Sequence, residues 1–299
     1  MFPADFGYVR AASLEHALTI LDHEAGQADV KVLAGGQSLL PMMKLRLARP
    51  QLIVDIGEVA ELKGVTSGPG DATTIGALTT YRELQRESRV MLAYPAIRDA
   101  LDVLADPQVR ARGTIGGCVA HGDPAADLPA VLLALGAQVT IASRARSRTV
   151  RLDDFLLGLY ATDLAEDELV IAITLPAAPA GQAYEKFEQP ASRLPLAGVC
   201  AVAELQDGRI AAARVAVTGI GPRPFRALHS ERTVPAHRTN LAEAPIGIAA
   251  SLAEHGFTPL ADQHATGPFR VHLAEVLARR TLARAADRAR SAGPARGAG

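Results

Sequence analysis

The stretch AGGQSLLPMMKLRLARP, residues 34–50, places two adjacent glycines between the apolar run VKVL and a helix-like segment. Glycine at such a junction serves either a plain tight turn or a backbone that must approach a ligand closely, because it has no Cβ. A run of exposed backbone N–H groups also attracts an anion such as pyrophosphate. Taken singly, the stretch favours the plain turn.

A second and denser glycine cluster lies in RGTIGGCVAHGDPAADLPA, residues 112–130. We therefore predict two glycine-rich turns, at residues 34–38 and 114–118. Neither has the spacing of a G-x-G-x-x-G dinucleotide motif or of a phosphate loop that ends in GKS or GKT. Each cluster alone is therefore a weak signal.

Two carboxylates follow the second cluster. Asp123 precedes Pro124, and this pair predicts a helix start with Asp123 as the N-cap and Pro124 at the first helical position. Asp127 then falls in the first turn, where a carboxylate interacts favourably with the helix dipole. We assign Asp123 to the helix terminus, and we expect Asp127 to accept hydrogen bonds from sugar-like hydroxyls, such as those of a ribityl chain.

Strand-like and helix-like segments alternate up to about Pro176, which predicts an α/β region. Ser13 is predicted to cap the first helix, and Thr80 with Glu83 has the pattern of a capping box. Residues 177–182 are interpreted as a linker.

Beyond the linker the pattern changes to strands first and helices last, which predicts an α+β region. Asp207-Gly208 joins two strand-like runs as a hairpin turn. Helices are expected over residues 239–254 and 269–290, and residues 291–299 are expected to form a disordered tail.

The composition excludes several classes of protein. The 299 residues are 48% hydrophobic, and 31 basic against 32 acidic residues give a formal net charge of −1, so nothing points to nucleic acid or an anionic membrane. No apolar run is long enough to span a bilayer and no signal peptide is visible, so we expect a cytoplasmic protein. The two cysteines cannot hold an iron–sulfur cluster alone, and no spacing resembles a zinc site, so no metal site is expected.

Three stretches carry a resemblance to a known family: AGGQSLLPMMKLRLARP, DPQVRARGTIGGCVAHGDPAADLPA and YEKFEQPASR. At this spacing they are similar to the medium, FAD-binding subunits of molybdenum hydroxylases in the xanthine dehydrogenase family, and above all to carbon monoxide dehydrogenase medium subunits. The resemblance covers nearly the whole chain. It implies an α+β fold, with a two-subdomain α/β FAD-binding domain of the PCMH type over residues 1–176. An α+β C-terminal domain with an antiparallel sheet and helices follows over residues 182–290.

The resemblance implies FAD as the cofactor, with backbone amides of both glycine turns around its pyrophosphate. Asp127 matches a family carboxylate on the flavin's polar chain, and Lys186 matches a lysine that reaches the cofactor from the second domain. Such a cation would stabilise the reduced, anionic flavin, whereas without the resemblance Lys186 is interpreted as a solvated strand lysine. The cofactor-binding residues implied are Ala34, Gly35, Gly36, Gln37, Ser38, Thr114, Ile115, Gly116, Gly117, Cys118, Asp127, Val170, Lys186 and Leu194.

Two positions depart from the family pattern. Relatives often have an aromatic residue eight positions after the lysine, packed against the isoalloxazine, and this chain has Leu194 there. Leucine covers a ring face by apolar contact but cannot stack as an aromatic ring does. Cys118 stands where relatives commonly have a small polar residue, and we interpret it as a packed, inert thiol rather than one that modifies the flavin.

The function implied is electron transfer by an FAD-binding subunit of a heterotrimeric molybdenum hydroxylase. An iron–sulfur small subunit with 2Fe–2S clusters would supply electrons, a molybdopterin-containing large subunit would oxidise the substrate, and we expect a dimer of heterotrimers. No catalytic side chain is expected, and His121 is interpreted as a local hydrogen-bonding histidine. Two alternatives are a stand-alone FAD-dependent reductase or oxidase and a flavin-free structural subunit, although the intact glycine turns argue against the latter.

Overall fold

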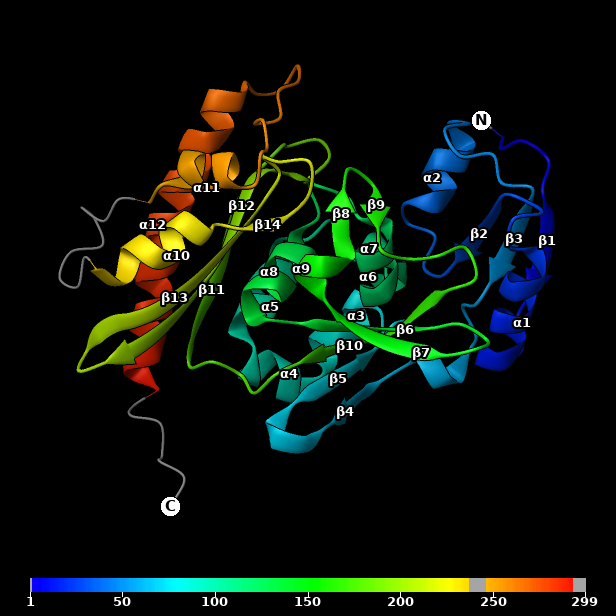
Figure 1. The fold of residues 1–299 in the computed structure, drawn as a ribbon, viewed down its shortest axis with the longest axis horizontal. Helices are drawn as coiled ribbons and strands as arrows, with labels where there is room; N and C mark the ends of the chain where they lie inside the picture. Colours follow the sequence, from blue (N-terminus) through cyan, green and yellow to red (C-terminus); the bar gives the residue numbers. More distant parts are fainter. Residues whose placement is uncertain (1, 237–245, 293–299) are drawn as a thin grey trace.

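The structure, a computed structural model, describes residues 2–236 and 246–292 and begins with a small N-terminal lobe (Figure 1). Leu18 and Leu21 pack with Val54 in its core, and the Ser13 hydroxyl accepts the N–H of His16, which confirms the predicted cap. Its parallel sheet has the order β1 (Gly7–Arg10), β3 (Leu52–Asp55), β2 (Val30–Leu33), and its helices are α1 (Leu14–Glu24) and α2 (Leu39–Lys44).

A second lobe is built on a five-stranded antiparallel sheet. Its order is β4 (Val65–Ser67), β5 (Thr73–Gly76), β10 (Leu169–Leu175), β6 (Gln138–Ala142), β7 (Ser147–Arg151). Between β5 and β6 come the helices α3 (Tyr81–Arg86), α4 (Ser88–Ala93), α5 (Pro95–Val103), α6 (Pro107–Arg112), α7 (Ile115–His121) and α8 (Asp127–Leu135). Before β10 come α9 (Leu152–Phe155) and the hairpin of β8 (Leu156–Gly158) and β9 (Ala161–Thr162). Thr80 and Glu83 form the predicted capping box of α3.

The C-terminal part is an antiparallel sheet covered by helices, as predicted. Its order is β11 (Gly181–Glu188), β12 (Pro195–Gln206), β13 (Arg209–Thr218), β14 (Phe225–Arg226), and α12 (Gly267–Ser291) packs on β11 and β12. Asp207 and Gly208 both have positive φ values, 52° and 74°, which confirms the hairpin turn.

The remaining helices are short. They are α10 (Leu228–Thr233), α11 (Ile248–Glu254) and the 3-10 helices η1 (Ala60–Leu62), η2 (Pro69–Asp71) and η3 (Val234–Ala236). The helix predicted over 239–254 is thus seen as α11, while residues 237–245 lie outside the described residues. Of the predicted tail, Ser291 ends α12, and residues 293–299 lie outside the described residues. No described helix is long and apolar enough to cross a membrane.

The second lobe and the C-terminal sheet share buried contacts. Tyr184, Cys200 and Val202 from the C-terminal sheet belong to the same apolar core as the helices of the second lobe. The fully buried side chain of Gln182 donates to the carbonyls of Ala93 and Pro179. Side chains of the C-terminal sheet are therefore held in fixed positions next to α5 and α8.

Candidate functional site

The first glycine segment is the loop between β2 and α2. Gly36 has a φ of +73°, and a Cβ on Gly35 would lie 2.0 Å from the carbonyl oxygen of Arg112, so both positions need glycine. Among the described residues, nothing accepts a hydrogen bond from the N–H groups of Gly35, Gly36, Gln37 and Ser38. A run of consecutive free N–H groups is a ready anion site. The predicted turn is confirmed in shape, and its donors are available to a phosphate.

The second glycine segment is not the predicted turn, because it forms the first turn of α7. Thr114 is the N-cap, and its hydroxyl accepts the N–H of Gly117. A Cβ on Gly116 would lie 2.4 Å from the Cβ of Ala77, so this glycine permits close packing. The N–H groups of residues 115–118 all have acceptors inside the protein: Thr79 O, Ala77 O, Thr114 Oγ1 and Thr114 O, in that order. Unlike the first segment, residues 115–118 offer no free amide.

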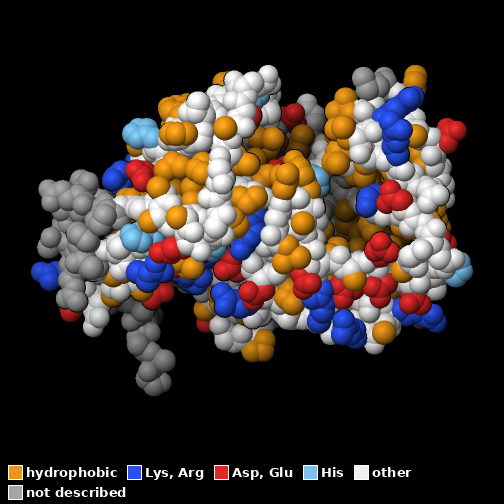
Figure 2. Space-filling model, turned by 45° about the horizontal axis from the view of Figure 1, so that its top comes forward, with side chains coloured by type: hydrophobic (Ala, Val, Ile, Leu, Met, Phe, Trp, Pro, Cys, Tyr) orange, Lys and Arg blue, Asp and Glu red, His pale blue; other side chains and the backbone are white. Residues whose placement is uncertain are grey.

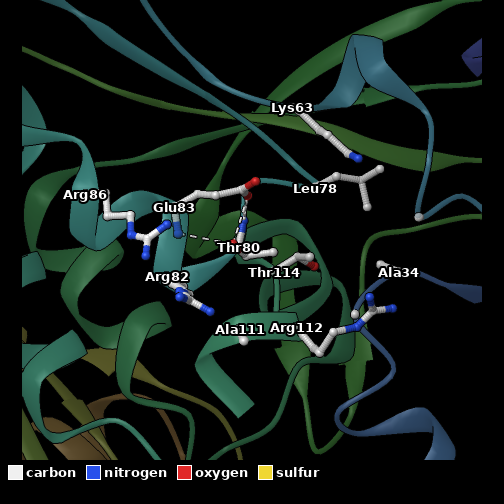
Figure 3. A pocket seen from close by; sticks show the side chains of 12 residues that line it. Ala34, Lys63, Leu78, Thr80, Arg82, Glu83, Arg86, Ala111, Arg112 and Thr114 are labelled. Atoms are coloured by element: carbon white, nitrogen blue, oxygen red, sulfur yellow. Dashed lines mark hydrogen bonds between the residues drawn. The ribbon is translucent and has the colours of Figure 1, made fainter. Parts of the chain in front are cut away.

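The two segments meet where the N-terminal lobe faces the second lobe. A Cβ on Gly117 would lie 3.8 Å from that of Ala34, and Gly35 touches the end of α6. Beside this contact lies a cavity of about 420 Å³, whose walls include Ala34, Gly35 and Thr114 (Figure 3). The molecular surface is also hollowed between the N-terminal lobe and the rest of the chain, with hydrophobic side chains along the walls (Figure 2).

Four cations that the sequence analysis missed also line the cavity: Lys63, Arg82, Arg86 and Arg112. The available signals were two arginines four residues apart on one predicted helix and a third directly before Gly113. Lys63 gave no signal, because it reaches the site only through the packing of the two lobes.

Asp127 and Lys186 lie together in a buried cluster at the C-terminal sheet. Their side chains are 4% and 2% exposed, and Lys186 Nζ lies 3.2 Å from Asp127 Oδ1. The Tyr184 hydroxyl donates to Asp127 Oδ1 at 2.6 Å, and Lys186 Nζ also donates to the carbonyl of Arg193 at 2.6 Å. Lys186 is therefore not the solvated strand lysine of the alternative interpretation. Tyr184 was missed, because nothing in the sequence shows that it meets Asp127.

The segment before Asp127 departs from the predicted helix start. Helix α8 begins at Asp127 with Ala126 as its N-cap, while Asp123 Oδ1 accepts the N–H of Ala125. The reason lies in the C-terminal sheet: the Thr218 hydroxyl donates to the carbonyls of Pro124 and Ala126 and holds this segment outside the helix. The prediction that Asp123 caps the helix is wrong, whereas Asp127 does lie in the first turn.

Burial raises the pKa of Asp127 to about 6, although the Lys186 ammonium and the Tyr184 hydroxyl act in the opposite direction. Both carboxylate oxygens are already engaged by these two side chains. The Asp127 carboxylate is therefore already bound to Lys186: it holds the ammonium in position and compensates its charge.

In the Lys186→Gln variant, the loss of stability with rising pH that Asp127 causes is expected to continue to higher pH than in wild type. The pKa of Asp127 is higher in the folded chain, at about 6, than in the unfolded chain, at about 3.9. The folded state binds this proton more tightly, so the contribution of Asp127 to stability falls as the pH rises between those values. Without the ammonium the folded pKa rises further, and the loss should continue above about pH 6. The free energy of unfolding in urea, measured from acid to mildly alkaline pH, tests this expectation, and Lys31→Gln at an exposed position is the control. If the free energy of unfolding depends on pH in the same way in wild type and Lys186→Gln, the Lys186 ammonium does not affect the pKa of Asp127.

The other residues singled out from the sequence differ in their exposure and contacts. Val170 is buried in β10, so only its backbone is available to a ligand. Leu194 is 43% exposed in the turn before β12, beside Arg193. Burial raises the pKa of the Cys118 thiol to about 12, which keeps it protonated and agrees with the inert interpretation. The His121 side chain makes no hydrogen bond with any described residue and instead packs against Tyr160, with ring centroids 5.0 Å apart, so the interpretation as a local hydrogen-bonding histidine is wrong.

Comparison with known proteins decides the family. The family model of the FAD-binding domain in molybdopterin dehydrogenase matches residues 4–178, and that of the CO dehydrogenase flavoprotein C-terminal domain matches residues 182–285. The chain belongs to the FAD-binding medium subunits of the molybdenum hydroxylase family. As a member of that family it is an oxidoreductase subunit, and FAD is its cofactor. The free amides of the first glycine segment and the cations beside it fit the diphosphate of FAD.

Similar proteins match over nearly their full length. The 6-hydroxypseudooxynicotine dehydrogenase complex subunit alpha of Paenarthrobacter nicotinovorans is 35% identical over 97% of both chains. The carbon monoxide dehydrogenase medium chain of Afipia carboxidovorans is 33% identical over 97% of this chain and 100% of its own. The structure of reconstituted CO dehydrogenase from Oligotropha carboxidovorans superposes with a TM-score of 0.89 at 33% identity, over 96% of this chain and 100% of that chain.

Proposed function

We propose that this molybdenum hydroxylase flavoprotein is the electron-transfer subunit of a heterotrimer. Its partners are an iron–sulfur small subunit and a molybdopterin-containing large subunit, in a dimer of heterotrimers in the cytoplasm. The observation that carries the proposal is the run of free amides at Gly35–Ser38 beside a cation-lined cavity. Relatives named as medium chains and complex subunits support the assembly. The division into domains at 1–176 and 182–290 belongs to the same proposal.

The bound FAD would supply the redox chemistry, taking electrons from 2Fe–2S clusters of the small subunit and passing them to an external acceptor. The chain itself holds and orients this cofactor. The amides of Gly35–Ser38 would donate to its diphosphate, and Gly117 keeps α7 close to that loop. Lys186 and Leu194 would flank the flavin end, and Asp127 keeps the lysine buried and in place.

Two groups of exposed apolar side chains support a role within an assembly. Leu45 and Leu47, directly after α2, are 58% and 73% exposed, and Leu157, Leu159 and Tyr160 on the β8–β9 hairpin are 55–60% exposed. Both α2 and this hairpin lie at the top of the view in Figure 1, on either side of the gap between the lobes. Monomeric proteins rarely expose large apolar patches, and a partner subunit that covers these side chains would shield them from water.

The decisive test is cofactor retention. The chain is incubated with FAD, desalted, and examined by its visible spectrum and by chromatography of the released cofactor. Near-stoichiometric FAD supports the proposal. The same measurement on the complex with its partner subunits tests whether those subunits are needed to complete the FAD site. Substrate turnover by the isolated chain favours the stand-alone reductase or oxidase instead. Absence of flavin from both the chain and the complex favours a structural subunit.

Leu194→Tyr is expected to change the absorption and fluorescence of bound FAD. An aromatic side chain at this exposed position would stack on the isoalloxazine, where leucine gives only apolar contact. The spectra of the two FAD-loaded proteins are compared directly, with Leu157→Tyr on the β8–β9 hairpin as the control. Identical spectra for wild type and Leu194→Tyr place this residue away from the ring.

A further inference from the structure

One contact between the second lobe and the C-terminal sheet is built on a row of three paired residues. Lys186 on β11 pairs with Gly198 on β12, and Gly198 pairs with Thr218 on β13. The Thr218 hydroxyl donates to two carbonyls directly before α8, at 2.8 and 2.9 Å. The row therefore fixes the start of α8, and with it Asp127, against the sheet that carries Lys186.

The Tyr184 hydroxyl reaches Asp127 through the space that Gly198 leaves free. A Cβ on Gly198 would lie 2.5 Å from Tyr184 Oη, so glycine at this position makes room for the hydroxyl. Tyr184 is 2% exposed, and its hydroxyl donates to Asp127 Oδ1 at 2.6 Å, its only hydrogen bond with a described residue. Burial, together with the nearby charge of Asp127, raises the pKa of Tyr184 well above its ordinary value, so the hydroxyl stays protonated and donates.

The charge of Asp127 decides how far the buried Lys186 ammonium is compensated. Lys186 Nζ lies 3.2 Å from Asp127 Oδ1, whereas Glu188 Oε2 is farther away, at 3.7 Å. Glu188 is also 35% exposed, and its other oxygen lies 3.9 Å from Arg193 Nε. The remaining titratable groups that face Asp127 or Tyr184 are buried, and burial raises their pKa values and keeps them uncharged: Tyr81 on α3, Cys118 on α7 and Cys200 on β12.

We propose that Tyr184 is a positioning residue for the redox reaction: its hydroxyl holds the Asp127 carboxylate charged and in place, and thereby sets how much positive charge Lys186 presents to the flavin. This inference rests on the proposed function, in which Lys186 flanks the flavin end. A cation there stabilises the reduced, anionic flavin, and a carboxylate that compensates the cation has the opposite effect. Because Tyr184 is buried, it acts through Asp127 and Lys186 rather than on the cofactor directly.

Loss of the hydroxyl should favour the protonated form of Asp127. Burial raises the pKa of Asp127 to about 6, and the Lys186 ammonium and the Tyr184 hydroxyl oppose this rise. Tyr184→Phe removes one hydrogen bond to the charged form, so the carboxyl should become about tenfold weaker as an acid, which raises its pKa by about one pH unit. Between about pH 6 and 7 more of the Lys186 charge is then uncompensated, and the reduction potential of bound FAD should be more positive than in wild type.

The first measurement is the titration of Asp127 in the FAD-free, full-length chain. NMR of isotope-labelled aspartate carboxyl groups follows it, and the Asp127→Asn variant assigns the signal. The matched control for Tyr184→Phe is Tyr94→Phe, because Tyr94 is 1% exposed and its hydroxyl donates to the carbonyl of Pro176 at 2.7 Å instead of to Asp127. Both variants lose one buried hydroxyl and should lose similar stability in urea, but only Tyr184→Phe should shift the titration of Asp127.

The second measurement is the reduction potential of retained FAD in the same proteins, from acid to alkaline pH. Tyr184→Phe should move the pH dependence that Asp127 causes to higher pH by about one unit, whereas Tyr94→Phe should leave it unchanged. In an Asp127→Asn background, Tyr184→Phe should no longer affect the potential, because the side chain at position 127 then carries no charge at any pH. Lys186→Gln should make the potential more negative, because the cation is lost.

A shifted titration together with a potential that depends on Tyr184 only while Asp127 is present supports the inference. Equal titration of Asp127 in wild type and Tyr184→Phe overturns it, and so does a change in potential that Tyr94→Phe reproduces. If Lys186→Gln leaves the potential unchanged, Lys186 lies away from the flavin, and the link from Tyr184 to the cofactor is overturned. FAD content is measured on the same samples, so absence of flavin from chain and complex refutes the proposed function, while the titration alone decides whether Tyr184 holds Asp127 charged.

Discussion

Asp127→Ala is expected to lower the free energy of unfolding by roughly 3–5 kcal/mol, the usual cost of removing one partner of a buried ion pair. The change leaves the buried Lys186 ammonium with Glu188, at 3.7 Å, as its carboxylate partner in place of the closer Asp127, and it leaves the Tyr184 hydroxyl without its acceptor. It should also weaken the retention of FAD, because the lysine that we propose to border the flavin loses its fixed position. Urea unfolding measures the first effect, and flavin content after desalting measures the second.

Asp123→Ala is the matched control for Asp127→Ala. Asp123 lies four residues earlier, and its side chain accepts only the N–H of Ala125, two residues on. Its loss should cost about 1 kcal/mol, typical of one local hydrogen bond, and should leave flavin content nearly unchanged. Equal flavin retention in the two variants would remove Asp127 from the cofactor site.

Local patterns in the sequence predicted much of the fold. The Ser13 cap, the Thr80–Glu83 capping box and the Asp207-Gly208 turn are each set by residues within four positions of one another, and all three are confirmed. The fold class and the family followed from motifs whose spacing spans the whole chain. Such features do not depend on how distant segments pack.

The errors in the site arise from contacts between distant segments. Asp123 and Pro124 have the local pattern of a helix start, but Thr218, more than ninety positions away in the chain, takes the carbonyls that would begin it. The second glycine segment was predicted as a turn, whereas Gly116 packs closely against the distant Ala77; the Thr114 N-cap was a local signal that went unused. Non-local pairing also explains why Lys63 and Tyr184 were missed.

Asp99→Ala is expected to loosen the contact between α5 and the C-terminal sheet, at a cost of about 3 kcal/mol. The Asp99 carboxylate accepts two hydrogen bonds from Arg288, one from Arg284 and one from the N–H of Tyr184. Arg288 also donates to the carbonyl of Gln182, so one carboxylate organises the start of β11 and the last turns of α12. Urea unfolding of the full-length chain measures the loss.

The control for Asp99→Ala lies on the same helix. Asp102 is exposed and has no ion pair or hydrogen bond from its side chain to a described residue, so Asp102→Ala should change stability by less than about 0.5 kcal/mol. Because Tyr184 is two residues from Lys186 on β11, Asp99→Ala should also lower FAD retention, by less than Asp127→Ala does. A stable Asp99→Ala protein with unchanged flavin content would show that the shared apolar core alone fixes the position of β11, and that the ion pairs around Asp99 add nothing to it.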